Sequence, residues 1–424
     1  MRKNLSLYFL VVISFFASCR KYDDVFNESP DERINEVLAQ YQQTLTDAPY
    51  GWKGWVYPSG LPGTAIGFYF KFDTANRVNM LSDFDTASAI NFRQSSYRLK
   101  ALQQPCLLFD TYSYIHTLCD PDGSVNGGDY GKGLYSDFEF AIDGIYGDTI
   151  KLTGRLNGSK AVFVKATSKE AQDYYDKKRN WEFDNFSRFL TYFKQLTVGQ
   201  GTYDVYTNKL TRQIKFVWPD AGGVKSFTTL YLYTPVGISF VTPFNDGKQT
   251  ISSLDNIRWD AGAQQITFKA GTQDGKITAY IKPLVVDSTA AQRWWSSAAA
   301  SRVYWVTLTG FHIDGVDDAL KLNSIPGFRF MSYFPNYAQG YDYSATVAGD
   351  DYGPAIKPTF GVNGIVKFRV DGTFGQVPAE AATVMNALIT KYQESTGYYL
   401  VQTSERSYDM VNVKDARSWI TWFN

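Results

Sequence analysis

Apolar and polar residues alternate with a period of two over much of the chain, and this pattern constrains the fold more than any other feature. The segments 68–72, 138–142, 214–218 and 265–269 each show it. Successive side chains of a strand point to opposite faces of a sheet, so the spacing predicts strands with one buried face. Many short strands separated by polar turns favour an antiparallel sheet over βαβ units.

Helices are expected at a few marked positions. The run Ser29-Pro30-Asp31-Glu32 has an N-cap, a proline in the first turn and a capping-box glutamate, and Pro49 ends the pattern. A second capping box predicts a helix that begins near Thr167, with Glu170 three residues later. Two further helices are expected, one opening at Thr289 and one over residues 378–395.

Aromatic and apolar residues recur at helical spacing after residue 180, and we interpret them as a buried helix face, not a ligand groove. They are Phe183, Phe186, Phe189, Leu190, Phe193 and Leu196.

Two stretches about 117 residues apart, 142–165 and 259–282, share an order of motifs. Each has two short strands and an Asn-Gly or Asp-Gly pair, the signal of a tight hairpin. A duplication and a chance likeness between hairpins both explain this order.

We therefore predict an α+β protein, mainly antiparallel β, with two helix-plus-sheet units that are candidates for a duplication and a distinct C-terminal α+β unit. The predicted boundaries are 1–18 for a signal peptide, 19–30 for a tether, and 31–166, 167–285 and 286–424 for three domains.

The first nineteen residues predict export. Arg2 and Lys3 precede an apolar run at 5–16, and small residues follow, the layout of a signal peptide. The run is shorter than the ~20 residues that a membrane-spanning helix needs. Residues 16–19 resemble the lipobox of bacterial lipoproteins, although Phe16 replaces the usual Leu; the resemblance implies acylation of Cys19 and cleavage before it. An ordinary signal peptide with a chance cysteine is the alternative.

The charge balance gives no reason to expect nucleic acid. The chain has 42 basic and 42 acidic residues, and without residues 1–18 it has 40 and 42. Nucleic-acid binding calls for a clustered basic face. The run at 20–24 resembles the signal that sends Bacteroidota lipoproteins to the outer face of the outer membrane; a solvated tether is the alternative.

No catalytic, metal or cofactor motif is found. There are only two histidines, and no metal-binding or Walker-type pattern is present. The loop at 120–129 resembles a calcium loop in its first ligands only, and a flexible glycine-rich loop is the alternative. For Cys106 and Cys119 the sequence leaves two alternatives open, a disulfide between them and two free thiols.

The remaining candidates are acids and aromatic residues. The pairs Asp137/Glu139 and Glu182/Asp184 are acids close in sequence, as a glycosidase site would need, but solvated surface acids are the default interpretation. Aromatic residues make up 17% of the chain. The adjacent Trp294 and Trp295 are the ligand-binding candidates; neighbours on a helix point about 100° apart, so we expect one of them to be buried.

Several segments taken in order resemble a family of Bacteroidota lipoproteins defined only as a domain of unknown function. They are the tether, the helix start at Ser29, residues 48–52, 96–99, 108–112 and 137–140. The likeness covers residues 19–165 best and the last third loosely. It implies no catalytic residues. It does imply an association with TonB-dependent transporters of starch-utilisation-like uptake systems.

We therefore expect a lipid-anchored protein on the outer-membrane surface that binds a glycan or peptide for nutrient uptake and is not an enzyme. The alternatives are a secreted glycan- or peptide-hydrolase with a carboxylate site and a structural envelope protein.

Overall fold

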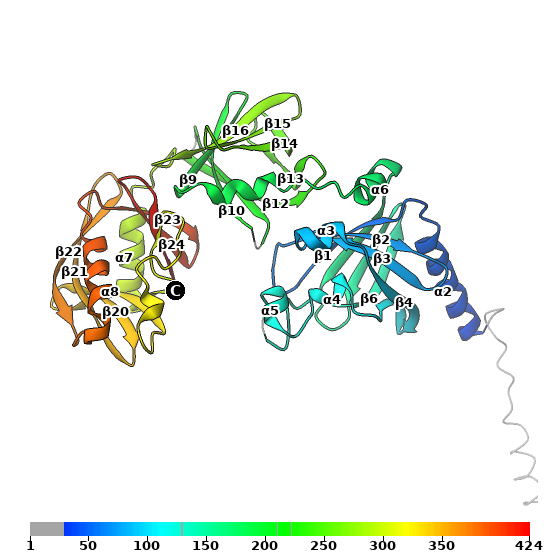
Figure 1. Ribbon diagram of the computed structural model, residues 1–424, viewed down its shortest axis with the longest axis horizontal. Helices are drawn as coiled ribbons and strands as arrows, with labels where there is room; N and C mark the ends of the chain where they lie inside the picture. Colours follow the sequence, from blue (N-terminus) through cyan, green and yellow to red (C-terminus); the bar gives the residue numbers. More distant parts are fainter. Residues whose placement is uncertain (1–28, 129, 210, 222) are drawn as a thin grey trace, which may run out of the picture. The chain divides into compact units, whose positions relative to one another are not determined.

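The computed structural model of the chain describes residues 29–128, 130–209, 211–221 and 223–424. The chain forms two compact units. Of the described residues, one unit comprises 29–60 together with Phe68–Ala171, and the other comprises Leu61–Gly67 together with Gln172–Asn424. Figure 1 shows the elements of both in sequence colours.

The first unit is built on a closed antiparallel barrel of eight strands in chain order, in which β8 pairs back onto β1. The strands are β1 (Trp52–Tyr57), β2 (Ile66–Phe72), β3 (Arg77–Ser82), β4 (Arg93–Leu102), β5 (Gln104–Phe109), β6 (Glu139–Tyr146), β7 (Thr149–Gly154) and β8 (Lys160–Lys165). The apolar residues of the alternating sequence pattern fill the interior of this barrel. Phe68, Phe70 and Phe72 are all buried, and the rings of Phe70 and Phe163 lie 4.7 Å apart.

Helix α2 (Pro30–Thr46) begins where the sequence predicts, because Ser29 and Glu32 form the expected capping box. Three short helices lie in the barrel's connections: α3 (Thr86–Ile90), α4 (Tyr114–Thr117) and α5 (Gly123–Asn126). After the barrel, α6 (Ser168–Tyr175) begins at the predicted Thr167–Glu170 pair, whose side chains are hydrogen-bonded at 2.9 Å.

A second closed barrel of eight antiparallel strands follows in the other unit, and β16 pairs back onto β9. Its strands are β9 (Phe193–Val198), β10 (Gly201–Asn208), β11 (Gln213–Asp220), β12 (Gly223–Tyr233), β13 (Gly237–Asn245), β14 (Thr250–Asp260), β15 (Gln265–Ala270) and β16 (Gln273–Tyr280). The two stretches that share a motif order are thus equivalent in the fold, since they fall on the last three strands of each barrel. The Asp-Gly pair of the second stretch, Asp274-Gly275, was expected to form a tight turn, and this prediction is wrong: these residues are inside β16, and the chain turns at Gly271, which has a positive φ of 60°.

The aromatic run after residue 180 is buried as expected, but it is not one helix. The 3₁₀ helix η1 (Glu182–Arg188) ends after seven residues, and Phe193 and Leu196 belong to β9. Leu190 is 40% exposed. Phe183, Phe186 and Phe189 pack into the core of the second barrel. One continuous helix and a helix followed by a strand would both bury most of these apolar residues. Their spacing in the sequence therefore could not distinguish the two structures.

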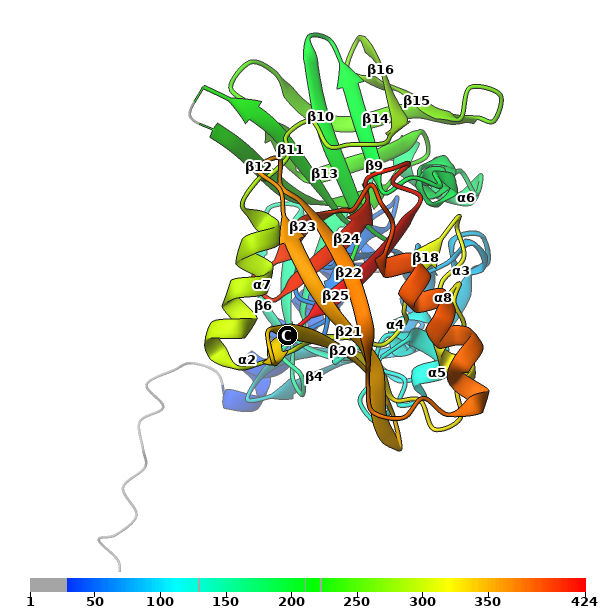
Figure 2. The ribbon, with the colours of Figure 1, turned by 90° about the vertical axis from the view of Figure 1, so that its left-hand side faces the viewer.

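The C-terminal part of this unit is a different, strongly curved sheet of nine strands in the order β17-β19-β20-β21-β22-β23-β24-β25-β18, in which β17 also pairs with β25. The strands are β17 (Trp305–Thr307), β18 (His312–Ile313), β19 (Phe330–Ala338), β20 (Tyr341–Ala348), β21 (Asp350–Phe360), β22 (Ile365–Phe374), β23 (Tyr398–Ser404), β24 (Ser407–Asn412) and β25 (Ser418–Phe423). Helices α7 (Ala290–Ser301) and α8 (Ala382–Tyr392) lie on either side of β22–β25 in Figure 2. Two short 3₁₀ helices, η2 (Leu322–Ser324) and η3 (Ala379–Ala381), complete the elements.

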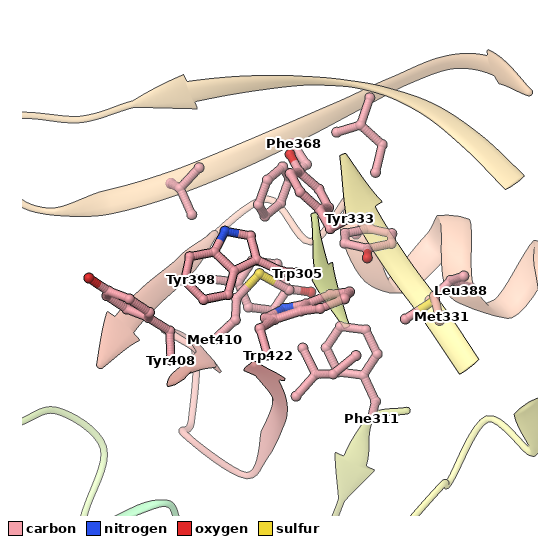
Figure 3. Packing of buried hydrophobic residues seen from close by; sticks show 14 of the residues in the cluster. Trp305, Phe311, Met331, Tyr333, Phe368, Leu388, Tyr398, Tyr408, Met410 and Trp422 are labelled. Atoms are coloured by element: carbon pink, nitrogen blue, oxygen red, sulfur yellow. The ribbon is translucent and has the colours of Figure 1, made fainter. Parts of the chain in front are cut away.

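The core of the C-terminal sheet is strongly aromatic (Figure 3). Trp305, Tyr333 and Trp422 converge there with Met331 and Met410. The predicted fold class, α+β and mainly antiparallel with two similar units and a distinct third, is confirmed.

Candidate functional site

A cavity of about 680 Å³ lies within the second unit, between the rim of the second barrel and the C-terminal sheet. Its volume is in the range of roughly 300–1,000 Å³ that is typical of small-ligand sites. The barrel contributes residues from η1 and β9–β12, and the sheet contributes residues from β18 and β23–β25.

Tyr192 fixes the two sides of the cavity to each other. Its backbone N–H donates to the carbonyl of Ala416 at 2.7 Å, and its hydroxyl donates to Asp409 Oδ2 at 2.7 Å. Its ring lies 5.5 Å from that of Trp419 and 5.9 Å from that of Tyr206. A small apolar cluster of both sides surrounds these contacts, so the cavity has a packed floor.

A row of side chains crosses the outer face of the barrel at the cavity wall. The strand register pairs Tyr206 with Lys215 and Lys215 with Thr228, and all three line the cavity. Paired residues in an antiparallel sheet lie on the same face, which explains the row. Burial lowers the pKa of the Lys215 ammonium and raises the pKa of the Tyr206 hydroxyl.

Lys194 brings a second ammonium group into the cavity. It shares a face of β9 with Leu196 and Val198, which fill the barrel. Its Nζ donates to the Tyr192 carbonyl at 3.1 Å and lies 5.2 Å from the ring centre of Phe186. Burial lowers its pKa to about 8, and no carboxylate of the described residues offsets that effect.

The two acids of the cavity are already engaged. Asp184 accepts a hydrogen bond from the Tyr233 hydroxyl and pairs with Lys209 at 2.7 Å. Asp409 accepts from Tyr192, and burial raises its pKa. Two free carboxylates that converge on a substrate, as glycoside hydrolysis requires, are therefore not found among the described lining residues.

An aromatic surface lies at the C-terminal side of the cavity. The ring of His312 stacks on Trp419 with centres 3.9 Å apart, and His312 Nδ1 is 2.6 Å from Asp317 Oδ1. Trp419 is half-buried, so part of its ring faces the cavity. The arrangement of indole and phenol rings beside unpaired ammonium groups is suited to binding a polar ligand.

Burial of the Lys194 ammonium destabilises the folded chain near neutral pH. An ammonium whose pKa falls on folding from 10.5 to about 8 disfavours folding below pH 8, and the penalty vanishes towards pH 10.5, where the unfolded chain also loses the proton. We expect Lys194→Met to raise the free energy of unfolding by about 1–3 kcal/mol near neutral pH, and by much less near pH ~10.5. Denaturant unfolding at the two pH values measures this, with the exposed Lys225→Met as control. A less stable variant at neutral pH would contradict the expectation.

The predicted ligand-binding tryptophans do not line this cavity. Trp294 is fully buried and packs against Tyr333 with ring centres 4.7 Å apart, so it offers no surface to a ligand in this structure. Trp295 is half-buried, and its Nε1 donates to Asp342 Oδ2 at 2.8 Å. The expectation that one of the two is buried is confirmed. Cys19 lies outside the described residues.

The acid pairs do not form sites of converging carboxylates. Asp137 is 3% exposed and accepts from the backbone N–H groups of Leu156, Asn157 and Ser159 and from the Ser159 hydroxyl. It therefore fastens the turn between β7 and β8. Glu182 accepts from the Trp259 backbone at 3.0 Å.

The other candidates from the sequence have structural contacts. Asp120 accepts from Tyr112 and from the backbone of Asp122, and Asn126 closes the same loop by donating to Asp120 O. Both Cys106 and Cys119 are free thiols in the structure. In the described ranges, no group of three or more His, Cys, Asp or Glu side chains is placed to hold a metal ion.

Sequence reasoning missed the residues of the cavity. Tyr192, Lys194, Lys215, Asp409 and Trp419 come from distant segments, and each has an ordinary place in a strand pattern. A lysine on the inward face of β9, between apolar residues, was the one available signal.

The fold and the cavity define a class of protein with two successive antiparallel barrels and a C-terminal α+β part. Residues 22–261 match the family model described as Domain of unknown function (DUF4302), and the chain belongs to this family. The match includes the first barrel and β9–β14 of the second. A search of curated proteins finds no match.

Proposed function

We propose that the protein is a lipid-anchored lipoprotein of the outer-membrane surface that binds a glycan for nutrient uptake and does not alter it. The observation that carries the proposal is the cavity of about 680 Å³, with aromatic rings and unpaired lysines on its wall and both of its acids engaged.

A glycan suits this cavity better than an extended peptide. Peptides are commonly captured by pairing with an exposed sheet edge, and the closed barrel that forms one wall of the cavity offers no such edge. Flat rings such as those of Trp419 and Tyr206 offer faces to sugar rings, and Asn208, Gln213 and Thr228 add hydrogen-bonding groups.

A binding assay tests the function. Soluble protein without residues 1–19 is applied to glycan and peptide arrays, and supernatants are checked for products. We expect glycan binding without product release. Trp419→Ala should weaken binding about tenfold, as is usual for a central aromatic contact, whereas Tyr280→Ala, an exposed aromatic outside the cavity, should not. Product release would favour the hydrolase, and neither binding nor products would favour a structural envelope protein.

The anchor is proposed from the N-terminal sequence. No helix in the part of the chain that the structure describes is both long and apolar enough to cross a membrane. Lipid attached at Cys19 would supply the anchor, and two or more acyl chains give stable attachment where one is marginal. An uptake role also implies a TonB-dependent transporter as partner, and co-purification from membranes tests that association.

Cys19→Ala should release the protein from the membrane fraction, because the thiol that accepts the lipid is absent. Fractionation with immunodetection measures this, and Cys106→Ala is the matched control. If the Cys19 variant stays in the membrane fraction as fully as the control, the lipoprotein hypothesis is wrong.

A further inference from the structure

We infer that the ligand of this cavity is an acidic oligosaccharide, a uronate oligomer whose carboxylates bind the ammonium groups of Lys194 and Lys215. The inference rests on the proposed glycan-binding function and specifies its ligand class.

The charged groups of the cavity wall leave a positive excess. Lys209 is neutralised by Asp184 at 2.7 Å. Neither Lys194 nor Lys215 forms an ion pair with a carboxylate of the described residues; Lys194 Nζ donates instead to the Tyr192 carbonyl at 3.1 Å. Asp409 is the one remaining acid of the wall, so the described lining carries more positive than negative charge even when Asp409 is ionised.

Both ammonium groups line the cavity together with the aromatic rings, Lys215 from the outer face of the barrel and Lys194 from the inward face of β9. Lys215 lies directly across from Tyr206 in the strand register, and Lys194 donates to the carbonyl of Tyr192. The Tyr192 ring in turn lies between those of Tyr206 and Trp419, at 5.9 and 5.5 Å. A sugar ring on this surface would thus have a cation within reach of a carboxylate on its edge.

The contacts of Lys194 with the Tyr192 carbonyl and the Phe186 ring do not supply an opposite charge. A desolvated ammonium without a counter-ion costs stability, and it is typical of a site where a ligand supplies the opposite charge. Lys209, on the same wall, differs from these two lysines because Asp184 neutralises its charge. Neutral glycans would leave both half-buried ammonium groups without a counter-ion.

Calorimetric titration of the soluble protein with a short oligogalacturonate, and with the same oligosaccharide after its carboxyls are reduced to hydroxymethyl groups, tests this inference. We expect the acidic form to bind at least about tenfold more tightly, because a charge-assisted hydrogen bond is worth more than a neutral one. Added salt should weaken that binding.

Variants assign the effect to the two lysines. Lys194→Gln and Lys215→Gln should each weaken uronate binding about tenfold. Lys225→Gln removes the same charge from an exposed ion pair of β12 outside the cavity and should leave binding unchanged. Asp409→Asn should strengthen binding, since it removes the opposing carboxylate while an acceptor for Tyr192 remains. Thermal unfolding curves identify any variant that fails to fold.

Equal binding of the acidic and reduced forms, lost in Trp419→Ala, would overturn this inference and leave the glycan-binding function standing. Binding of a poly-glutamate peptide in place of the uronate would overturn it as well. Absence of binding to every glycan would refute both the function and the inference.

Discussion

Replacing Trp294 by alanine should lower the free energy of unfolding of the soluble chain by about 3–5 kcal/mol, the usual cost of removing a buried aromatic side chain. The ring is fully buried, and it lies 4.7 Å from Tyr333, 6.2 Å from Trp305 and 6.3 Å from Trp422. The other buried residues of α7 are alanines, at positions 290, 291 and 298, which are too small to fill the space that the indole leaves. Denaturant unfolding measures the loss, and hydrogen exchange should place it in α7 and β19.

Two controls separate the ring from its N–H group. Trp294 Nε1 is buried and has no hydrogen-bond partner in the described part of the chain. Trp294→Phe keeps an aromatic ring without that group, so we expect a smaller loss of about 1–2 kcal/mol. Trp295→Ala should cost less than Trp294→Ala, because Trp295 is half-buried. Equal losses for the two alanine variants would contradict the packing described.

Asp137→Ala should destabilise the first unit by about 3–5 kcal/mol, the cost of breaking a buried charged network. The change removes the acceptor of three backbone N–H groups and of the Ser159 hydroxyl, and the two donors of Ser159 are left in a buried position. Gly154 completes the arrangement: a Cβ there would lie 1.9 Å from Asp137 Oδ2. Unfolding experiments measure the loss, and faster hydrogen exchange is expected in β7 and β8.

Glu139→Gln is the matched control, since Glu139 is half-buried on β6 and was paired with Asp137 by sequence proximity. We expect it to change stability by less than about 0.5 kcal/mol. A glycan-cleaving activity abolished by both substitutions, with stability intact, would instead support the hydrolase alternative.

The strand pattern and the helix signals were readable because their causes are local. The alternation at 68–72 needs only one buried face, and the Ser29–Glu32 box satisfies N–H groups within a single turn. The break after Arg188 could not be predicted, because Phe183, Phe186, Phe189 and Leu196 are all buried in a barrel whose other strands lie far along the chain. Barrel closure depends on pairs such as Trp52 with Lys165, which no local pattern specifies.

The cavity was even less accessible to sequence reasoning. Lys194 and Asp409 are separated by more than half the chain, and neither has a motif around it. Trp294 and Trp295 were the predicted ligand contacts because they are adjacent in the sequence. What an aromatic ring can contact depends on its burial, and burial is a property of the assembled sheet.

The sequence by itself determined the class of fold, the positions of several strands and of the capped helices, and the prediction of a lipid anchor at Cys19. These follow from side-chain periodicity, capping hydrogen bonds and a short N-terminal pattern. Only the tertiary structure decided that the strands close into two barrels, which aromatic residues are core, and where Lys194, Lys215 and Trp419 meet. The physical reason is that desolvation and cross-strand contact depend on segments that the folded chain alone brings together.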